Sequence, residues 1–153
     1  MASQAIAGYG TLLKRGASAS GSNNDASYAT LGEVKNISGP STQTSTIDVT
    51  THSSAASGNY REFIPSLIDP GTIEVDMNWV HADATHKLIW TDLQNRTKRD
   101  WRIVVPPTAS AATCNMDFAA YVVGMPKEFP TDDVISSKIS LRITGAITIV
   151  TTP

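Results

Sequence analysis

Apolar and polar residues alternate along several stretches of the chain, as they do in β-strands that bury one face. The alternation is clearest in residues 72–79 and 138–149, where one set of alternating positions is apolar: Ile73, Val75, Met77, Trp79, Ile139, Leu141, Ile143, Ile147 and Ile149. Weaker alternation or strand-forming composition marks five further segments: residues 9–14, 28–37, 45–50, 99–105 and 116–124. This pattern predicts an antiparallel sheet with one buried and one polar face.

One segment departs from the alternation and predicts a helix. Residues 83–96, DATHKLIWTDLQNR, contain good helix formers and neither Gly nor Pro. Asp83 is a natural N-cap. An apolar stripe follows it, formed by Leu88, Ile89 and Leu93 with Trp90 at its edge. The predicted fold class is therefore mainly β: an antiparallel β-sandwich or partial barrel with one flanking α-helix.

Two stretches fit neither a strand nor a helix. Residues 17–30, ASASGSNNDASYAT, have the composition of a flexible connection. Residues 51–71 form a long loop between two predicted strands, and such loops are most often functional. Two adjacent strands cannot bury the apolar side chains of this loop, which are Tyr60, Phe63, Ile64, Leu67 and Ile68. We therefore expect an interaction loop within a single domain that spans residues 1–153.

The composition narrows the classes of function. The net charge is −2 and the pI about 5.8, so the chain has no basic surplus for gripping nucleic acid phosphates. The single cysteine, Cys114, excludes an internal disulfide and a cysteine-based metal site. The apolar runs are too short to span a membrane, and no signal-peptide pattern is present. We expect a protein made in the cytoplasm that does not insert into a membrane.

The residue types that carry out reactions are sparse and poorly spaced. His81, Asp83 and His86 could suggest a metal site, but the spacing favours polar residues around a helix N-cap. Glu74 and Asp76 lie about 7 Å apart along one strand face, which is more typical of a solvated face than of an acid and base pair. Nucleophile-elbow, P-loop and dinucleotide motifs are missing from the sequence. We therefore predict a protein that is not an enzyme and needs no cofactor.

Four pieces of the chain, taken in order, resemble a known family: VKNISGP, IDVTTHSS, REFIPSLIDPGTIEVDMNW and ITGAITI. Over roughly residues 28–150 the chain is similar to the major tail tube proteins of long-tailed, siphophage-type bacteriophages. The resemblance implies a β-sandwich with a flanking helix. It also implies hexameric rings that stack into a hollow tube, through which the genome leaves the capsid.

The resemblance gives the two predicted surfaces a role. The loop at residues 51–71 would stack one ring on the next through Tyr60, Arg61, Phe63, Ile64, Leu67 and Ile68. Three carboxylates would face the lumen: Asp48, Glu74 and Asp76. The alternating positions Ile47, Val49, Ile73, Val75 and Met77 would face the core. Lys138 and Arg142, on the polar face of the last strand, would be offset by cross-strand partners such as Glu74 or Asp76.

The resemblance also implies partners and a location. The partners would be other copies of the chain, a tape-measure protein, and tail terminator and tip proteins. DNA would pass through the lumen without specific binding, because an acidic lining repels phosphate. The protein would belong to the tail of the virion and would be assembled in the cytoplasm of the bacterial host.

Two other readings remain open at this point. One is a tube or ring protein of a related contractile or type VI secretion machine, and a closed ring that does not polymerise would distinguish a ring protein. The other is a monomeric β-sandwich binding module, such as a carbohydrate-binding domain. Such a module usually has an exposed aromatic platform, whereas Trp79 and Trp101 alternate with apolar positions, which favours the core.

Overall fold

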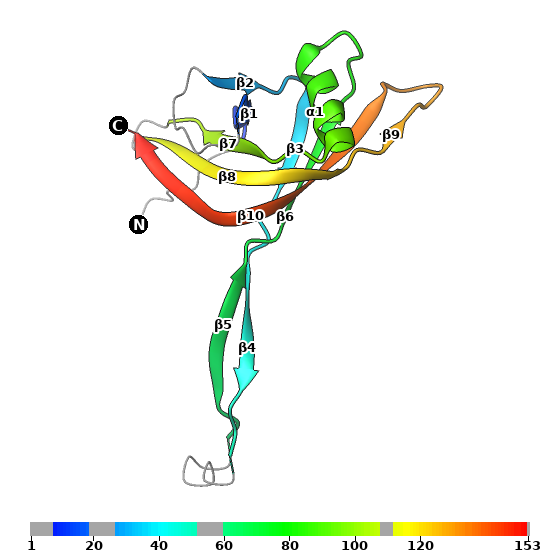
Figure 1. The fold of residues 1–153 in the computed structure, drawn as a ribbon. Coiled ribbons are helices and arrows are strands. Elements are labelled where there is room, and N and C mark those ends of the chain that lie inside the picture. Colours follow the sequence, from blue (N-terminus) through cyan, green and yellow to red (C-terminus); the bar gives the residue numbers. More distant parts are fainter. Residues whose placement is uncertain (1–7, 19–26, 52–59, 108–111, 153) are drawn as a thin grey trace.

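The computed structural model describes residues 8–18, 27–51, 60–107 and 112–152, whose main body is a curved antiparallel sheet (Figure 1). The strands of this sheet run in the order β2-β1-β7-β8-β10-β6-β3, and the short β9 pairs with β10. Their bounds are β1 Leu12–Gly16, β2 Tyr28–Thr30, β3 Val34–Ser38, β6 Thr72–Asn78, β7 Arg99–Val105, β8 Thr113–Gly124, β9 Lys127–Glu128 and β10 Ser136–Thr152. The predicted mainly β class is confirmed: the fold is mostly antiparallel sheet with one helix.

The alternating residues of β6 and β10 form the centre of the core, as the pattern predicts. Ile73, Val75 and Met77 are fully buried, while Glu74 between them is exposed. The two strands pair in antiparallel register, with Val75 opposite Ile139. Burying each aliphatic side chain of this size contributes roughly 1.5–3 kcal/mol, so these paired faces stabilise the body. Trp101 is also fully buried, which confirms its predicted core position.

The alternation of β10 continues beyond the core, and the predicted burial of Ile149 is wrong. The pairing of β10 with β8 shifts between Thr144 and Thr148, which lie opposite Ala119 and Asp117. Past this irregularity the strand runs beyond the packed body. Ile147 is half-buried against the core, and Ile149 is 61% exposed.

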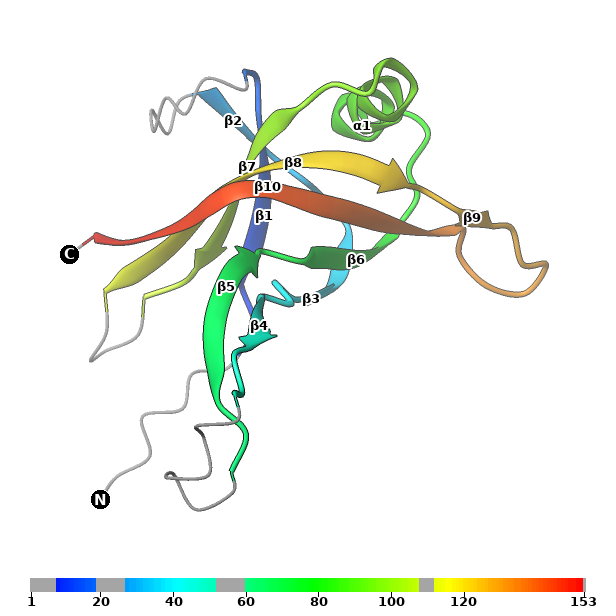
Figure 2. The ribbon, with the colours of Figure 1, turned by 60° about the horizontal axis from the view of Figure 1, so that its bottom comes forward.

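The helix α1 (Ala84–Asn95) forms where the sequence predicts it and lies close to β8 of the sheet (Figure 2). The carboxylate of Asp83 caps it by accepting hydrogen bonds from the backbone N–H groups of Thr85 and His86. Of the predicted stripe, Ile89 is fully buried and Leu93 half-buried, but Leu88 is exposed. The rest of the buried face is polar: His86 and Asp92. No helix in the described residues is long and apolar enough to cross a membrane.

The His86 side chain contacts backbone groups in the connection between β6 and α1 and in the segment before β3. Its Nδ1 accepts a hydrogen bond from the Val80 N–H at 3.1 Å, and its Nε2 faces the Gly32 carbonyl oxygen at 3.3 Å. These contacts fit the tautomer that carries its proton on Nε2. The imidazole stacks on Trp79, and the Lys127 ammonium lies 4.0 Å from the centre of the Trp79 ring. The described residues contain no group of three or more His, Cys, Asp and Glu that could hold a metal ion.

Buried ion pairs tie the helix and the strands together. Arg15 of β1 donates from Nε to the Asp92 carboxylate of α1 at 2.6 Å, and both side chains are buried. Arg99 at the start of β7 donates to the other oxygen of Asp92 at 3.1 Å. Arg102 of β7 makes a two-pronged contact with Asp117 of β8, at 2.6 and 2.9 Å. One carboxylate thus joins α1 to two strands, and a second pair joins β7 to β8.

Candidate assembly site: the projecting arm and its neck

Two strands leave the body as a projecting arm (Figure 1). They are β4 (Gln43–Asp48) and β5 (Phe63–Asp69), which pair with each other in a separate two-stranded sheet. The prediction that residues 51–71 lack secondary structure is therefore wrong for Phe63–Asp69, while residues 52–59 lie outside the described residues. The predicted flexible stretch at 17–30 includes the strand β2, and residues 19–26 of it are likewise outside.

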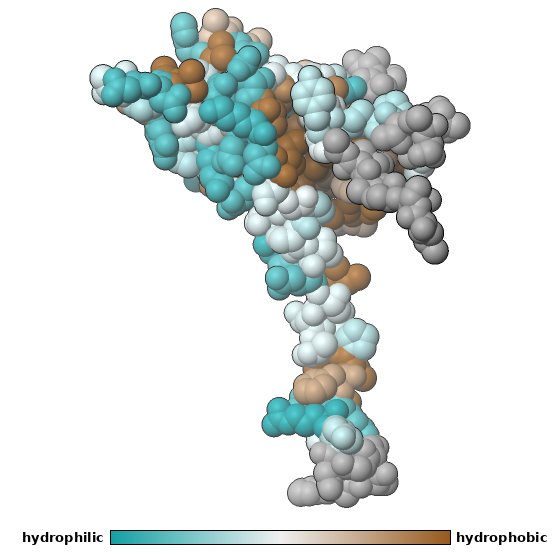
Figure 3. Space-filling model, turned by 180° about the vertical axis from the view of Figure 1, so that it is seen from behind, coloured by the Kyte–Doolittle hydropathy of each residue, from teal (hydrophilic) through white to brown (hydrophobic). Residues whose placement is uncertain are grey.

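The arm exposes the apolar residues that the sequence singled out. The exposed fractions of its large apolar side chains are 85% for Leu67, 65% for Ile68, 53% for Phe63, 50% for Ile47 and 48% for Ile64. Tyr60, which precedes β5, is also exposed. Figure 3 shows separate apolar patches (brown) on the visible side of the narrow arm. A two-stranded hairpin is marginally stable alone, and exposed apolar patches mark interaction surfaces. The arm therefore has the character of a contact element.

The arm separates residues that the sequence placed together. Ile47 lies opposite Ile64 in the arm, so its predicted core position is wrong, and the core cluster includes neither Ile47 nor Val49. The reason is that β4 pairs with β5 instead of joining the body sheet. Asp48 is also on the arm, where its carboxylate lies 3.6 Å from the Arg61 guanidinium. It is thus on a different sheet from Glu74 and Asp76.

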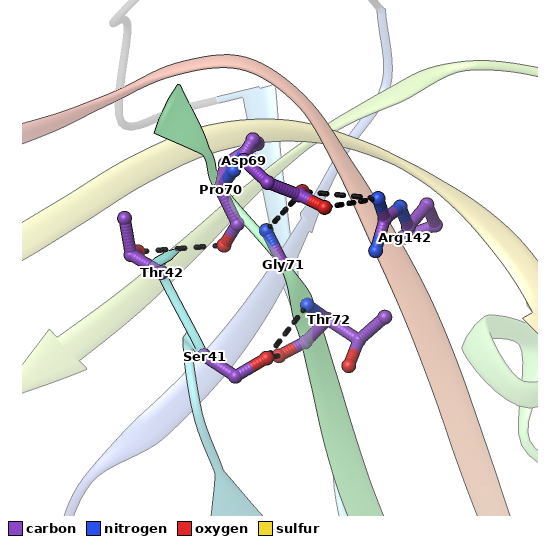
Figure 4. A network of polar contacts seen from close by, with 7 residues as sticks. All are labelled: Ser41, Thr42, Asp69, Pro70, Gly71, Thr72 and Arg142. Atoms are coloured by element: carbon purple, nitrogen blue, oxygen red, sulfur yellow. Dashed lines mark hydrogen bonds and ion pairs between the residues drawn. The ribbon is translucent and has the colours of Figure 1, made fainter. Parts of the chain in front are cut away.

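A network of polar contacts holds the two neck segments, residues 40–42 and 69–72, against each other (Figure 4). The Thr72 N–H donates to the Ser41 hydroxyl at 3.1 Å, and the Ser41 N–H donates to the Thr72 carbonyl at 3.3 Å. The Thr42 hydroxyl donates to the Pro70 carbonyl at 3.4 Å. These bonds continue the pairing of the arm into the body.

The root of the arm is also attached to β10, the long strand of the body. Arg142 of β10 donates from Nη2 to both oxygens of Asp69, at 3.0 and 2.7 Å (Figure 4). The same carboxylate accepts the Gly71 N–H at 2.9 Å, and the Ile143 N–H donates to the Gly71 carbonyl at 3.1 Å. Asp69 and Gly71 therefore fix the arm's direction relative to the sheet.

Glycines allow the close approach at the neck. Gly71 has a φ of 79°, and a Cβ atom on it would overlap the carbonyl oxygen of Ser41. On the other side, a Cβ atom on Gly39 would lie 2.7 Å from the Thr72 carbonyl oxygen. Sequence reasoning missed this neck. The available signal was a pair of chain-breaking dipeptides, Gly39-Pro40 and Pro70-Gly71, at both ends of the segment that forms the arm.

The contact between Asp69 and Arg142 at the neck is expected to depend on pH. The Gly71 N–H and then Arg142 stabilise the charged carboxylate of Asp69, which lowers its pKa below the ordinary value of 3.8. Because the pKa falls on folding, the contact is fully formed at neutral pH and is lost as the pH drops through the lowered pKa.

Carbon NMR titration of the Asp69 carboxylate in the folded subunit measures this effect. We expect a midpoint below 3.8 in the native chain. Arg142→Gln should raise the midpoint, since it removes the second of the two stabilising contacts. Lys138→Gln, on the same strand but paired elsewhere, should leave it unchanged. A midpoint that is insensitive to Arg142→Gln would contradict the assigned contact between Arg142 and Asp69.

The outer polar face of the body carries balanced charges. Glu74 is exposed on β6, and its carboxylate lies 2.8 Å from the Lys138 ammonium of β10. This contact, together with the field of Asp76, raises the pKa of Lys138. The predicted offset of Lys138 by a carboxylate of β6 is thus confirmed. For Arg142 it is wrong, because that guanidinium pairs with Asp69 at the root of the arm.

The body buries its own core, and the arm leaves its apolar side chains exposed, as an element that contacts another molecule does. The lambda phage tail tube protein family matches residues 14–150, and the chain belongs to this family. The match covers the arm, its neck and the body sheet except the first two residues of β1 and the last two of β10.

Solved structures share the fold at low sequence identity. The tail of the empty gene transfer agent particle aligns with a TM-score of 0.72 at 16% identity, over 95% of this chain and 99% of that chain. The SPP1 tail tube gives 0.67 at 12%, over 93% and 77%. The cap that terminates the tube of the anti-feeding prophage gives 0.71 at 12%, over 99% and 95%. No curated protein matches the chain in sequence.

Proposed function

We propose that the chain is the subunit of a tail tube, in which copies assemble into stacked rings around a hollow channel. It acts as a structural protein and carries out no reaction. The family match over residues 14–150 supports a tail tube role. The observation that supports assembly is the exposure of apolar side chains on the arm. Six large apolar side chains there are each at least 48% exposed: Ile47, Tyr60, Phe63, Ile64, Leu67 and Ile68.

The proposed partners follow from this role. The chain binds other copies of itself in rings, which we take to be hexameric, and the rings stack through the arm. The finished tube contacts a tape-measure protein and the terminator and tip proteins of the tail. Its place is the tail of a virion or a similar particle, and its assembly takes place in the cytoplasm of the bacterial host.

The solvent-exposed polar face of β6 and β10 is the proposed wall of the channel. Glu74 and Asp76 on this face would meet passing DNA, and Lys138 and Arg142 would lie beside them. Because each of these cations already contacts a carboxylate, the wall has little free positive charge to hold phosphates. Asp48 lies on the arm, and we propose that it also faces the channel, because the arm would continue the wall from one ring to the next. A reconstruction of the tube that places Glu74 on the outer surface would overturn this assignment.

The arm's role is tested by replacing its aromatic anchor. We expect Phe63→Ala to raise the concentration needed for tube formation by about 30-fold, since aromatic anchors often contribute about 2 kcal/mol or more to a contact. The thermal stability of the subunit should not change, because Phe63 is outside the core cluster. Electron microscopy and sedimentation of the purified chain over a concentration series measure the effect.

Phe129→Ala is the matched control, because Phe129 is an equally large side chain that is 69% exposed on the body. It should polymerise much more readily than Phe63→Ala. If the native chain forms tubes and Phe63→Ala forms them at the same concentration, Phe63 is not an anchor. If the native chain forms no tubes at any concentration, the tube function itself is wrong.

A second candidate is a tube or cap protein of a contractile machine. The fold likeness to the cap of the anti-feeding prophage favours it, at the level of the fold alone. The same microscopy separates a cap from a tube subunit: a cap forms closed rings that do not polymerise, whereas a tube subunit forms long hollow filaments.

A further inference from the structure

The neck contains one peptide bond whose chemistry differs from that of its neighbours, the bond between Asp69 and Pro70. Among the aspartates of the sequence, Asp69 alone precedes a proline. The proline nitrogen belongs to a tertiary amide, so it takes up a proton and departs more readily than the nitrogen of an ordinary peptide bond. The Asp69 side chain supplies a carboxyl group beside the carbonyl carbon of the same bond. The bond thus combines a nearby nucleophile with a good leaving group.

Cleavage of this bond needs only acid and water. An oxygen of the Asp69 side-chain carboxyl group attacks the backbone carbonyl carbon of Asp69 and closes a five-membered cyclic anhydride. The bond from that carbon to the Pro70 nitrogen breaks, and the nitrogen leaves with the electron pair and the carboxyl proton. Water then opens the anhydride and leaves Asp69 with two free carboxyl groups. The products are residues 1–69 and residues 70–153.

In the folded subunit both oxygens of this carboxyl group are already bonded (Figure 4). The Gly71 N–H donates to Oδ1 at 2.9 Å, and Arg142 donates to Oδ1 at 3.0 Å and to Oδ2 at 2.7 Å. These contacts lower the pKa of Asp69, so they favour the form that lacks the proton which the leaving nitrogen must receive. They also make each oxygen a weaker nucleophile. The neck therefore protects the bond.

The protection depends on one charged neighbour and is open to solvent. Among the described residues, Arg142 is the charged side chain that contacts this carboxyl group. The opposite neck segment presents the uncharged side chains of Ser41 and Thr42, and Lys138 of β10 is paired with Glu74. The Asp69 side chain is 50% exposed, so water and acid reach it without unfolding of the body.

We propose that the Asp69–Pro70 bond is an acid-labile cleavage site in the neck, which the contacts of Asp69 with Arg142 and Gly71 keep intact at neutral pH. The site goes beyond the proposed function and does not depend on it, because the reaction takes place within one subunit. Cleavage separates β5 from β6, while β4 stays joined to the body through residues 39–42 (Figure 1). The arm is then attached by one neck segment in place of two, and the change is irreversible.

Mass spectrometry of the purified subunit after incubation in mild acid tests the proposal. The pH is chosen so that circular dichroism still shows a folded subunit, and a parallel sample at the same pH contains urea. We expect residues 1–69 and 70–153 as products in both samples, formed about threefold or more slowly in the folded subunit, because a neighbouring guanidinium opposes protonation of a carboxylate. An absence of these products in urea would overturn the cleavage site. Equal rates in the two samples would overturn the protection by the neck.

Arg142→Gln tests the protecting contact directly. In the folded subunit this variant should be cleaved several-fold faster than the native chain, and in urea the two should be cleaved at the same rate. Lys138→Gln removes a cation from the same strand that is paired with Glu74, and it should behave as the native chain does. A folded Arg142→Gln subunit that is cleaved no faster than Lys138→Gln would show that the guanidinium does not protect the bond.

Asp69→Glu tests the anhydride step without reference to the fold. It keeps a carboxyl group before Pro70, but the attack would have to close a six-membered ring, which forms more slowly. In urea we expect cleavage of this variant to fall to the level seen at another proline bond of the chain, Phe129–Pro130. Cleavage of Asp69→Glu at the native rate would overturn the proposed chemistry.

Discussion

Replacing Asp92 with alanine is expected to lower the free energy of unfolding of the subunit by about 3–5 kcal/mol. Asp92 is 2% exposed and accepts hydrogen bonds from Arg15 and Arg99. Arg15 is itself 4% exposed, so the substitution would leave a buried guanidinium without its carboxylate. It would also release α1 from β1 and β7, which this single side chain connects.

Urea unfolding at neutral pH, followed by tryptophan fluorescence, measures this change. Asp92→Asn keeps one acceptor oxygen and should lose less stability than Asp92→Ala. Glu128→Ala changes an exposed carboxylate and should stay within about 0.5 kcal/mol of the native chain. A loss below about 1 kcal/mol for Asp92→Ala would show that the ion pairs do not couple the helix to the sheet.

The body of the fold could be predicted wherever one face of an element is buried. β6 and β10 carry a clear alternation, because burial of one face selects apolar residues at every second position. The helix was predictable from its composition and from Asp83, since capping is a local interaction. Ile149 was misassigned because its alternation continues past the point at which β10 leaves the core.

β5 escaped prediction for the opposite reason. Nearly all of its residues are exposed, so no buried face imposes an alternation on the sequence. Its apolar content still indicated an interaction element, and the interpretation of Phe63, Ile64 and Leu67 as contact residues stays a prediction. Ile47 was misplaced because its own alternation gives no sign of whether its strand joins the body or pairs with β5.

The neck and the buried ion pairs could not be predicted from local pattern. Arg142 and Asp69 are 73 residues apart, and Arg15 and Asp92 are 77 apart. Such pairs form only after the sheet order has brought the segments together, and a charged residue in the sequence looks the same whether its partner is water or a distant carboxylate. An apolar hollow beside the neck has the same origin, since Met116 of β8, Ile147 of β10 and Ile68 of the arm each line part of it.

Gly71→Ala is expected to abolish tube formation while the body of the subunit remains folded. Gly71 has a φ of 79°, where a residue with a Cβ atom is strained by about 1–3 kcal/mol. The added methyl group would also overlap the Ser41 carbonyl oxygen, so the two neck segments must move apart. Their separation would break the bonds between Ser41 and Thr72 and would turn the arm away from the direction that Asp69 and Arg142 set.

Gly10→Ala distinguishes the displaced neck from simple backbone strain. Gly10 has a similar φ of 86°, but a Cβ atom on it would lie at an ordinary distance of 3.4 Å from the Pro106 ring. It should lose only the strain energy and still form tubes. Circular dichroism and unfolding curves establish that both subunits are folded, and electron microscopy at matched concentrations compares their assembly. Tubes of native appearance from Gly71→Ala would mean that the neck does not determine how the arm meets its neighbour, because the substitution cannot be accommodated without moving the arm's root.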